Sequence, residues 1–209
     1  MKVCRLVLAF VIAGSAFGLA GCSGVKTFQT FYKSGVAPEV AKSWHVTAVS
    51  VTVPEELTVS EEHTFEPTAD IVWREDAIGD RHAQVATILK EAITRGANGL
   101  KGPQPVRLDV TVSRFHALTL EAESLNVPGI GVHNVNFVIR VLDAKTGAVL
   151  AGPEDIDAAM PALTGTEMIK ARVRGESQRT QIQAHVAATI AGWLGVGPDQ
   201  RDSFVRSGR

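Results

Sequence analysis

Cysteine is scarce in this chain: its 209 residues include only Cys4 and Cys22. A disulfide framework or a cysteine-rich zinc site needs more thiols at regular spacing. Cys4 lies in the leader segment described below, so if lipid occupies Cys22, no thiol is left for a disulfide, even in an oxidising compartment. We therefore expect the stability of the fold to come from apolar packing.

An excess of charge of either sign is also missing. The formal net charge is -1, and lysine and arginine form no continuous stripe along the chain. Binding to the phosphates of a nucleic acid requires such a stripe, so nucleic acid is not expected as the main partner. Hydrophobic residues make up 45% and charged residues 21% of the chain, which is typical of a globular protein with its own core.

There is a single long hydrophobic run, at residues 6–20, and it follows the basic residues Lys2 and Arg5. It is shorter than the roughly 20 residues that a bilayer-spanning helix needs. A short basic segment followed by an apolar run of this length is typical of a signal peptide. We therefore predict a signal peptide at residues 1–21.

The end of this run, Leu19-Ala20-Gly21-Cys22, resembles the lipobox of bacterial lipoproteins. The resemblance implies cleavage between Gly21 and Cys22 and attachment of diacylglycerol to the Cys22 thiol. Two or more acyl chains anchor a protein stably without a membrane span. Ser23 follows the cysteine, which by the same resemblance implies the outer membrane, facing the periplasm. The alternative is an ordinary secretory signal in which the cysteine is incidental.

The remaining chain is interpreted as three segments. We expect a lipidated tether at residues 22–43, an α+β periplasmic domain at 44–195 and a disordered tail at 196–209. The tether has aromatic residues that could pack on the domain or lie at the lipid surface, and the tail is polar with several arginines.

Within the domain, alternation of apolar and polar residues predicts strands at 44–53, 106–112 and 134–142, with shorter strands at 71–73, 148–150 and 155–163. The alternation slips near residues 113–115, which indicates a β-bulge. Helical periodicity predicts helices at 80–95 and 178–194, the first starting at Asp80 and stopping at Gly96. The fold class expected is α+β: a small, mostly antiparallel sheet with two amphipathic helices packed on one face.

Motifs for catalysis and cofactors are missing. There is no phosphate loop, no nucleophile elbow and no pair of histidines at zinc-binding spacing, so we predict no cofactor and no metal. His116 and His133 flank the central segment and could meet across strands, which leaves an enzyme as one hypothesis. The acidic run at residues 55–62 is interpreted as a solvated face, with a loose carboxylate cluster as the alternative.

Two pairs of neighbouring residues combine an aromatic ring with an arginine: Trp73 with Arg74, and Arg114 with Phe115. Such residues are favoured anchors of protein interfaces, so these four are the candidate interface. The alternative is that both rings belong to the core and both arginines are solvated.

Several segments resemble an uncharacterised lipoprotein family of alphaproteobacteria. They are the segments at 69–74, 79–81, 84–85, 114–119, 131–134 and 146–150. That family has no established activity, so the resemblance implies no catalytic residue. The layout of anchor, tether, strands and helices is more distantly similar to auxiliary lipoproteins of envelope ABC-type transport systems.

Three functions are weighed on this basis. The leading hypothesis is a non-enzymatic accessory protein of the cell envelope that is anchored by lipid and binds another envelope protein. The second is a module that holds a lipid or another small apolar ligand between helices and sheet. The third is an enzyme that uses His116 or His133 with an acidic neighbour.

Overall fold

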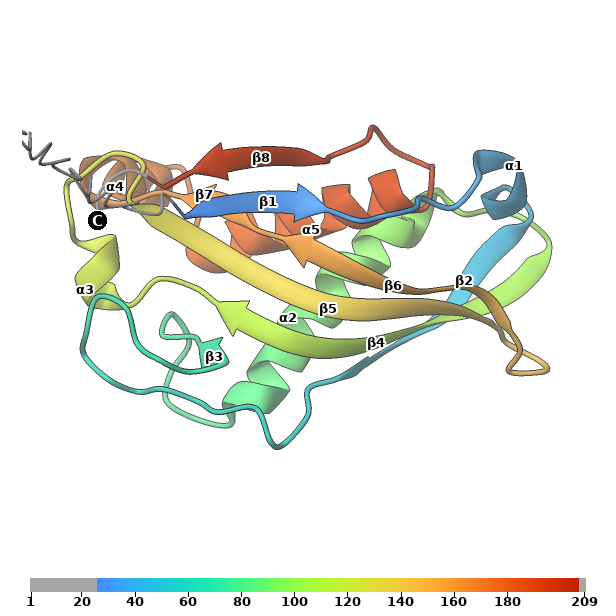
Figure 1. Cartoon of the computed structure of the whole chain (residues 1–209), viewed down its shortest axis with the longest axis horizontal. Coiled ribbons are helices and arrows are strands. Elements are labelled where there is room, and N and C mark those ends of the chain that lie inside the picture. Colours follow the sequence, from blue (N-terminus) through green and yellow to red (C-terminus); the bar gives the residue numbers. More distant parts are fainter. Residues whose placement is uncertain (1–25, 207–209) are drawn as a thin grey trace, which may run out of the picture.

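The computed structural model describes residues 26–206. The predicted signal peptide, its cleavage site and Cys22 lie outside this range. A mixed sheet of eight strands runs along the molecule with the strand order β2-β4-β5-β6-β1-β8, while β3 pairs with β4 and β7 pairs with β5 (Figure 1). The strands are β1 (Thr27–Phe31), β2 (Trp44–Thr52), β3 (Ile71–Val72), β4 (Gln104–His116), β5 (Gly131–Asp143), β6 (Val149–Ala158), β7 (Met160–Ala162) and β8 (Asp202–Val205).

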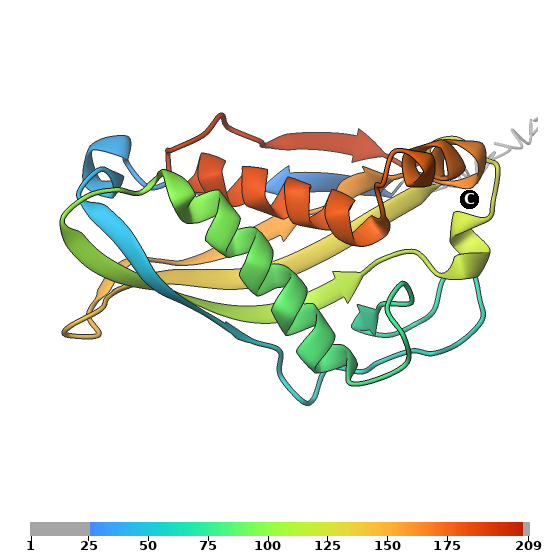
Figure 2. The same ribbon diagram turned by 180° about the vertical axis from the view of Figure 1, so that it is seen from behind.

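Five α-helices and one 3-10 turn complete the described part of the chain. They are α1 (Pro38–Ala41), α2 (Arg81–Gly96), η1 (Ala97–Gly99), α3 (Leu120–Glu123), α4 (Gly165–Val173) and α5 (Gln178–Trp193). The two long helices, α2 and α5, lie together on one side of the sheet (Figure 2). The other side, which we call the open face, carries no helix from residues 26–206 and faces the viewer in Figure 1.

The fold class needs a correction. An α and β protein is confirmed, but the sheet is larger than predicted, and it is mixed, because β2 and β3 both run parallel to β4. The α2 crossover between β2 and β4 allows this parallel pairing, which a tight hairpin could not connect. Three short helices accompany the two that periodicity predicted.

Local signals placed the long elements well. The carboxylate of Asp80 accepts a hydrogen bond from the Ala83 amide and caps α2, and Ser177 forms a capping box with Thr180 at the start of α5. The predicted bulge in β4 appears as a register shift between Val112 and Arg114.

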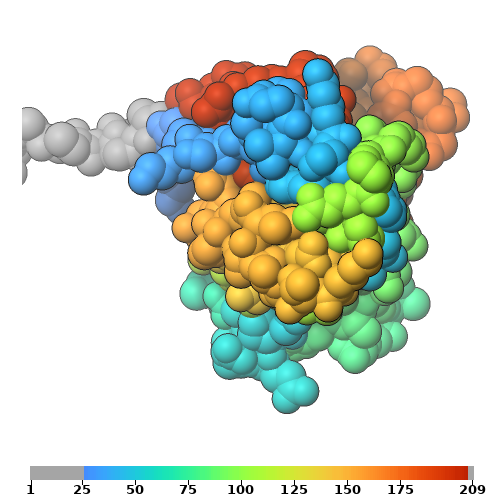
Figure 3. Space-filling view, turned by 90° about the vertical axis from the view of Figure 1, so that its right-hand side faces the viewer, coloured from blue at the N-terminus to red at the C-terminus, as the bar shows by residue number. Residues whose placement is uncertain are grey.

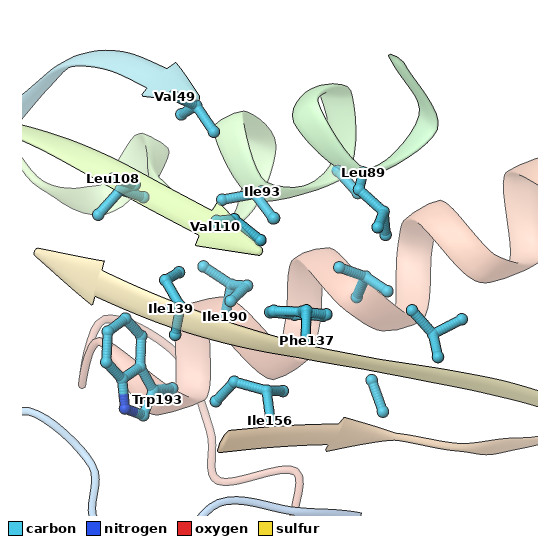
Figure 4. Close-up of a cluster of buried hydrophobic side chains, with 14 of the residues drawn as sticks. Val49, Leu89, Ile93, Leu108, Val110, Phe137, Ile139, Ile156, Ile190 and Trp193 are labelled. Atoms are coloured by element: carbon cyan, nitrogen blue, oxygen red, sulfur yellow. The ribbon is translucent and has the colours of Figure 1, made fainter. Parts of the chain in front are cut away.

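The core fills the space between the two long helices and the sheet. Figure 4 shows Leu89 and Ile93 of α2 and Ile190 and Trp193 of α5 against strand side chains such as Phe137. All of these side chains are at most 1% exposed. Full burial of a side chain of this kind stabilises the fold by about 1.5–3 kcal/mol, so this layer is a main source of the stability of the domain.

The two long helices cross at Gly96. A Cβ atom at this position would lie 2.4 Å from the carbonyl oxygen of Ala187 on α5. Gly96 has an ordinary right-handed backbone conformation (φ -63°). The predicted stop at Gly96 does coincide with the end of α2, but the need for glycine comes from the close approach of α5 and not from a left-handed cap.

Two segments that the sequence analysis placed outside the domain belong to the sheet. Residues 27–31 of the predicted tether form β1, and residues 202–205 of the predicted tail form β8. Tyr32 is 1% exposed and donates a hydrogen bond to Asp199 (2.8 Å). Both strands are too short for a clear alternation pattern, and their pairing partners are far away in the sequence.

Candidate functional site

A groove of about 820 Å³ lies at the end of the molecule where β1 begins and β8 ends. Its walls come from the loop at residues 65–69, the ends of β3 and β4, α3 with the loop after it, and the start of β5. Lys26 and Arg206, the first and last described residues, also line it. We call this the end groove.

The charged side chains of the end groove are mostly cationic. The Lys26 ammonium lies 3.6 Å from the Glu66 carboxylate, and the Arg206 guanidinium lies 2.8 Å from the same group. These cations hold the pKa of Glu66 below its ordinary value, mainly through the hydrogen bond from Arg206. Arg114 is exposed and forms no ion pair with any described residue, so the groove keeps an excess of positive charge.

The apolar part of the end groove lies beside these charges. Leu118 and Ala122 form a small buried cluster with Ala162, separate from the main core. Leu125 and Ile130 continue this wall. Phe65, which is 61% exposed, lines the groove from the loop at residues 65–69. A surface with cations next to apolar walls suits a partner that is itself amphiphilic.

His116 lies in the end groove but is not free to act as a base through both nitrogens. Its Nε2 atom forms a hydrogen bond with the carbonyl oxygen of Ala69. Burial lowers the pKa of His116, and the Arg114 charge acts in the same direction, so the ring is neutral at pH 7. A neutral ring must therefore donate from Nε2 to this carbonyl.

A second hollow of about 640 Å³ lies on the open face next to the end groove, and Arg114 lines both. Asp157 stands in this hollow between Gln29 and Asn136. Burial raises the pKa of Asp157, and the polar contacts with these two amides only partly oppose the effect. Arg114 is thus the residue common to both hollows.

The structure corrects the predicted interface. Trp73 and Phe115 are both 0% exposed and pack edge to face, with ring centroids 5.7 Å apart. The Arg74 side chain is 9% exposed and lies 3.3 Å from Glu61. These three residues cannot anchor a partner, and of the four candidates only Arg114 lies on an accessible surface. The alternative interpretation is correct for both rings and for Arg114, but not for Arg74.

The two histidines of the enzyme hypothesis lie on opposite faces of the sheet. His116 on β4 is paired with Asn134 on β5, so these two side chains share a face. His133 precedes Asn134 and points to the other face, where its side chain is 1% exposed. The pair therefore cannot act on one substrate.

The acidic run at residues 55–62 does not form a carboxylate cluster. Glu61 makes two hydrogen bonds, of 2.6 and 3.2 Å, to the buried guanidinium of Arg81. The described residues contain no group of three or more His, Cys, Asp or Glu side chains that could hold a metal ion.

Sequence reasoning missed Lys26, Glu66 and Arg206. Lys26 and Arg206 lie in segments taken as tether and tail, and Glu66 lies in a long loop. No local pattern marks them, because the groove exists only where β1, β8 and the loop converge.

No helix in the described range 26–206 has the length and hydrophobicity needed to cross a bilayer. Residues 21 and 22, the predicted cleavage and lipidation site, are outside that range. No curated protein matches the chain.

Several solved structures show distant similarity, and three of them illustrate it. A single-substitution variant of the PelC dodecamer from Paraburkholderia phytofirmans is 11% identical, covering 83% of this chain and 100% of its own, with a TM-score of 0.38. A candidate lipoprotein from Caulobacter crescentus CB15 is 18% identical, covering 76% and 94%, with a TM-score of 0.35. Another PelC dodecamer structure is 11% identical, covering 82% and 98%, with a TM-score of 0.33.

A family model matches residues 44–209, which is most of the chain. This agrees with the expectation of a family without established activity. The chain belongs to DUF6778, a family of unknown function.

Proposed function

We propose that this protein is a lipid-anchored, non-enzymatic accessory component of the bacterial cell envelope that binds a partner in the end groove. The observation that carries the proposal is the position of this groove. Lys26 lines it, and Lys26 follows the predicted lipid-bearing Cys22 by only four positions. The binding surface would therefore lie close to the membrane.

The composition of the end groove supports binding. Arg114 supplies an exposed cation without an ion-pair partner among the described residues, next to apolar walls from Leu118 and Leu125. Arginine beside apolar surface is common at the energetic centre of interfaces. His116 and His133 lie on opposite faces of the sheet and cannot act together, which favours binding over catalysis.

The location follows from the lipobox. With Ser23 after the modified cysteine, we place the protein on the periplasmic face of the outer membrane. The relation to auxiliary lipoproteins of ABC-type transport systems stays a prediction, as does the origin in alphaproteobacteria. A permease gene and an ATPase gene next to the gene for this chain would support the first of these.

A lipid or another small apolar ligand is the second candidate. The space between helices and sheet, where this ligand was predicted to bind, is filled by the core shown in Figure 4. The end groove, with an apolar wall and a volume of about 820 Å³, is a suitable place instead.

Site-specific photo-crosslinking in native envelopes tests the binding proposal. A photoreactive amino acid at position 114 should give a discrete protein adduct, or a lipid adduct if the second candidate is correct. The same amino acid at position 95, on the exposed side of α2, is the control. Adducts that are identical from both positions, or none from position 114, would contradict binding in the groove.

The Cys22→Ser variant tests the anchor. We expect the unprocessed precursor to accumulate and labelled palmitate to be absent from the protein, because serine lacks the nucleophilic thiolate. A Cys4→Ser variant is the matched control and should be processed and labelled normally. Normal processing of Cys22→Ser would show an ordinary secretory signal.

A further inference from the structure

Four large exposed apolar side chains lie on segments at the end of the domain that holds the end groove. They are Leu120 on α3, Val127 in the following loop, and Ile169 and Val173 on α4, with exposed fractions of 53%, 42%, 64% and 85%. We call them the end patch. Figures 1 and 2 show α3 and α4 at the same end of the long axis as the start of β1.

The segments that carry the end patch are tied to one another. The Arg172 guanidinium on α4 makes hydrogen bonds of 2.8 and 2.9 Å to both carboxylate oxygens of Glu123 on α3. The Thr166 amide donates to the side-chain oxygen of Asn126 (3.2 Å), and the Thr164 hydroxyl donates to the Val127 carbonyl (3.2 Å). The segments that carry the four apolar side chains are therefore held in fixed positions relative to one another.

The orientation of α4 is set by its inner face. Met168 and Ala171 are buried, which fixes the rotation of the helix about its axis. Ile169 and Val173 are four residues apart and so lie on a common outer face. The chain exposes this apolar pair at a place where a soluble helix normally carries polar residues.

The cations beside the end patch are already neutralised. Lys170 pairs with Glu167 (2.8 Å), Arg172 with Glu123 and Arg174 with Glu176 (2.7 Å). A strongly charged partner therefore gains little here, whereas apolar insertion does not depend on net charge. The long stem of Lys170 can also lie along apolar surface while its ammonium stays in water.

The position of the lipid anchor identifies the partner. Lys26 lines the end groove together with Ala122 and Leu125, which belong to α3 and to the loop after it. Four residues of extended chain span at most about 14 Å, so Cys22 lies within about that distance of Lys26. The acyl chains would therefore enter the bilayer beside the end patch.

We propose that the end patch rests on the lipid bilayer, with Ile169 and Val173 of α4 inserted at the level of the headgroups. This inference rests on the proposed lipid anchor at Cys22. It gives the domain a fixed orientation, with the rim of the end groove at the membrane surface and the β5–β6 hairpin pointing away. Figure 3 views that far end, where the hairpin and α1 lie.

Fluorescence quenching on vesicles tests this orientation. Because the lipidated chain has no free thiol, Ile169→Cys accepts one fluorophore at a unique place, in the full lipidated protein bound to phosphatidylethanolamine and phosphatidylglycerol vesicles. The matched control is Val149→Cys, on the hairpin and 53% exposed. At a depth of roughly 5–10 Å, lipids with a spin label high on the acyl chain should lower the emission at position 169 by about twofold and leave position 149 unchanged.

Each outcome decides the proposal. If the spin-labelled lipid lowers the emission equally at both positions, with the protein bound to the vesicles, the bilayer contact is overturned while the anchor stays intact. Protection of position 169 from both the spin-labelled lipid and aqueous iodide would show that a protein covers the patch, which also overturns it. Failure of the protein to float with the vesicles would instead contradict the anchor. Melting curves of both labelled variants confirm that each is folded.

Discussion

The imidazole of His133 is 1% exposed, and neither ring nitrogen has a hydrogen-bond partner among the described residues. Burial lowers the pKa of His133 to about 3, and the nearby His185 acts in the same direction. The ring is therefore neutral in the folded protein. An unfolded chain binds a proton at this position below its ordinary pKa of about 6.5.

This difference predicts how stability depends on pH. As the pH falls below about 6.5, the unfolded state gains a proton that the folded state does not bind until about pH 3, so the free energy of unfolding falls. From about pH 7.5 to about pH 5, the loss from this residue is about 2 kcal/mol. His133→Leu should reduce the loss by this amount in urea unfolding measured at both pH values.

The variant should also keep full stability at neutral pH, because removing a buried polar group without a partner is close to neutral or stabilising. An unchanged pH dependence in His133→Leu would show that His133 is protonated or solvated in the folded protein.

At the scale of elements, one buried arginine ties the segment between β2 and α2 to the start of α2. Arg81 is 4% exposed, and its guanidinium also donates to the carbonyl oxygens of Asp76 (3.2 Å) and Ala77 (3.1 Å) as well as to Glu61. Its hydrogen bond also lowers the pKa of Glu61. The loop is therefore fastened to the start of α2.

Arg81→Met should destabilise the protein by about 3 kcal/mol, because Glu61 and two carbonyl groups lose their donor. Urea unfolding measures the change. The control is Arg95→Met on the exposed side of the same helix, which should change stability by less than about 0.5 kcal/mol. Equal effects of the two substitutions would refute the role of the loop contact.

The crossing of α2 and α5 leads to a prediction for Gly96→Ala. Alanine favours a helix over glycine by about 1 kcal/mol. The added Cβ would lie 2.4 Å from the Ala187 carbonyl oxygen and 2.9 Å from the Cβ of Ile190, so the helices must separate. We expect a net loss of about 2 kcal/mol in the free energy of unfolding. Thr94→Ala, on the exposed side of α2, is the control, and a stabilised Gly96→Ala variant would contradict the close crossing.

At the scale of the whole molecule, the segment before β2 is part of the folded body. The Trp193 indole donates to the Ser34 carbonyl (3.1 Å), and the Val36 amide donates to the Trp193 carbonyl (2.7 Å). β1 also separates β6 from β8, so its removal would leave β8 without a partner. The chain that follows the predicted lipidation site therefore enters the domain as a strand of its sheet.

A chain that begins at Trp44 should lose about 4 kcal/mol or more compared with one that begins at Ser23, because Tyr32 burial and the pairing of β1 are lost. Typical domains have about 5–15 kcal/mol in total, so the shortened chain would lose a large share of its stability and melt at a lower temperature. Circular dichroism during thermal unfolding measures this. Equal melting temperatures would show that the segment is a tether after all.

The sequence by itself determined the features that depend on neighbours along the chain. Alternation placed β2, β4 and β5, and periodicity placed α2 and α5. The lipobox is likewise a local pattern. Local hydrogen bonds and one-sided burial leave a record at fixed spacing, which can be read without the fold.

Only the tertiary structure decided which residues meet. β1 and β8 owe their existence to partners that the chain brings from far away, and the end groove forms where both strands approach the loop at residues 65–69. It also decided that Trp73 and Phe115 are buried while Arg114 is exposed. Pairing and burial between distant segments depend on the packing of the whole sheet, and short local patterns carry no record of them.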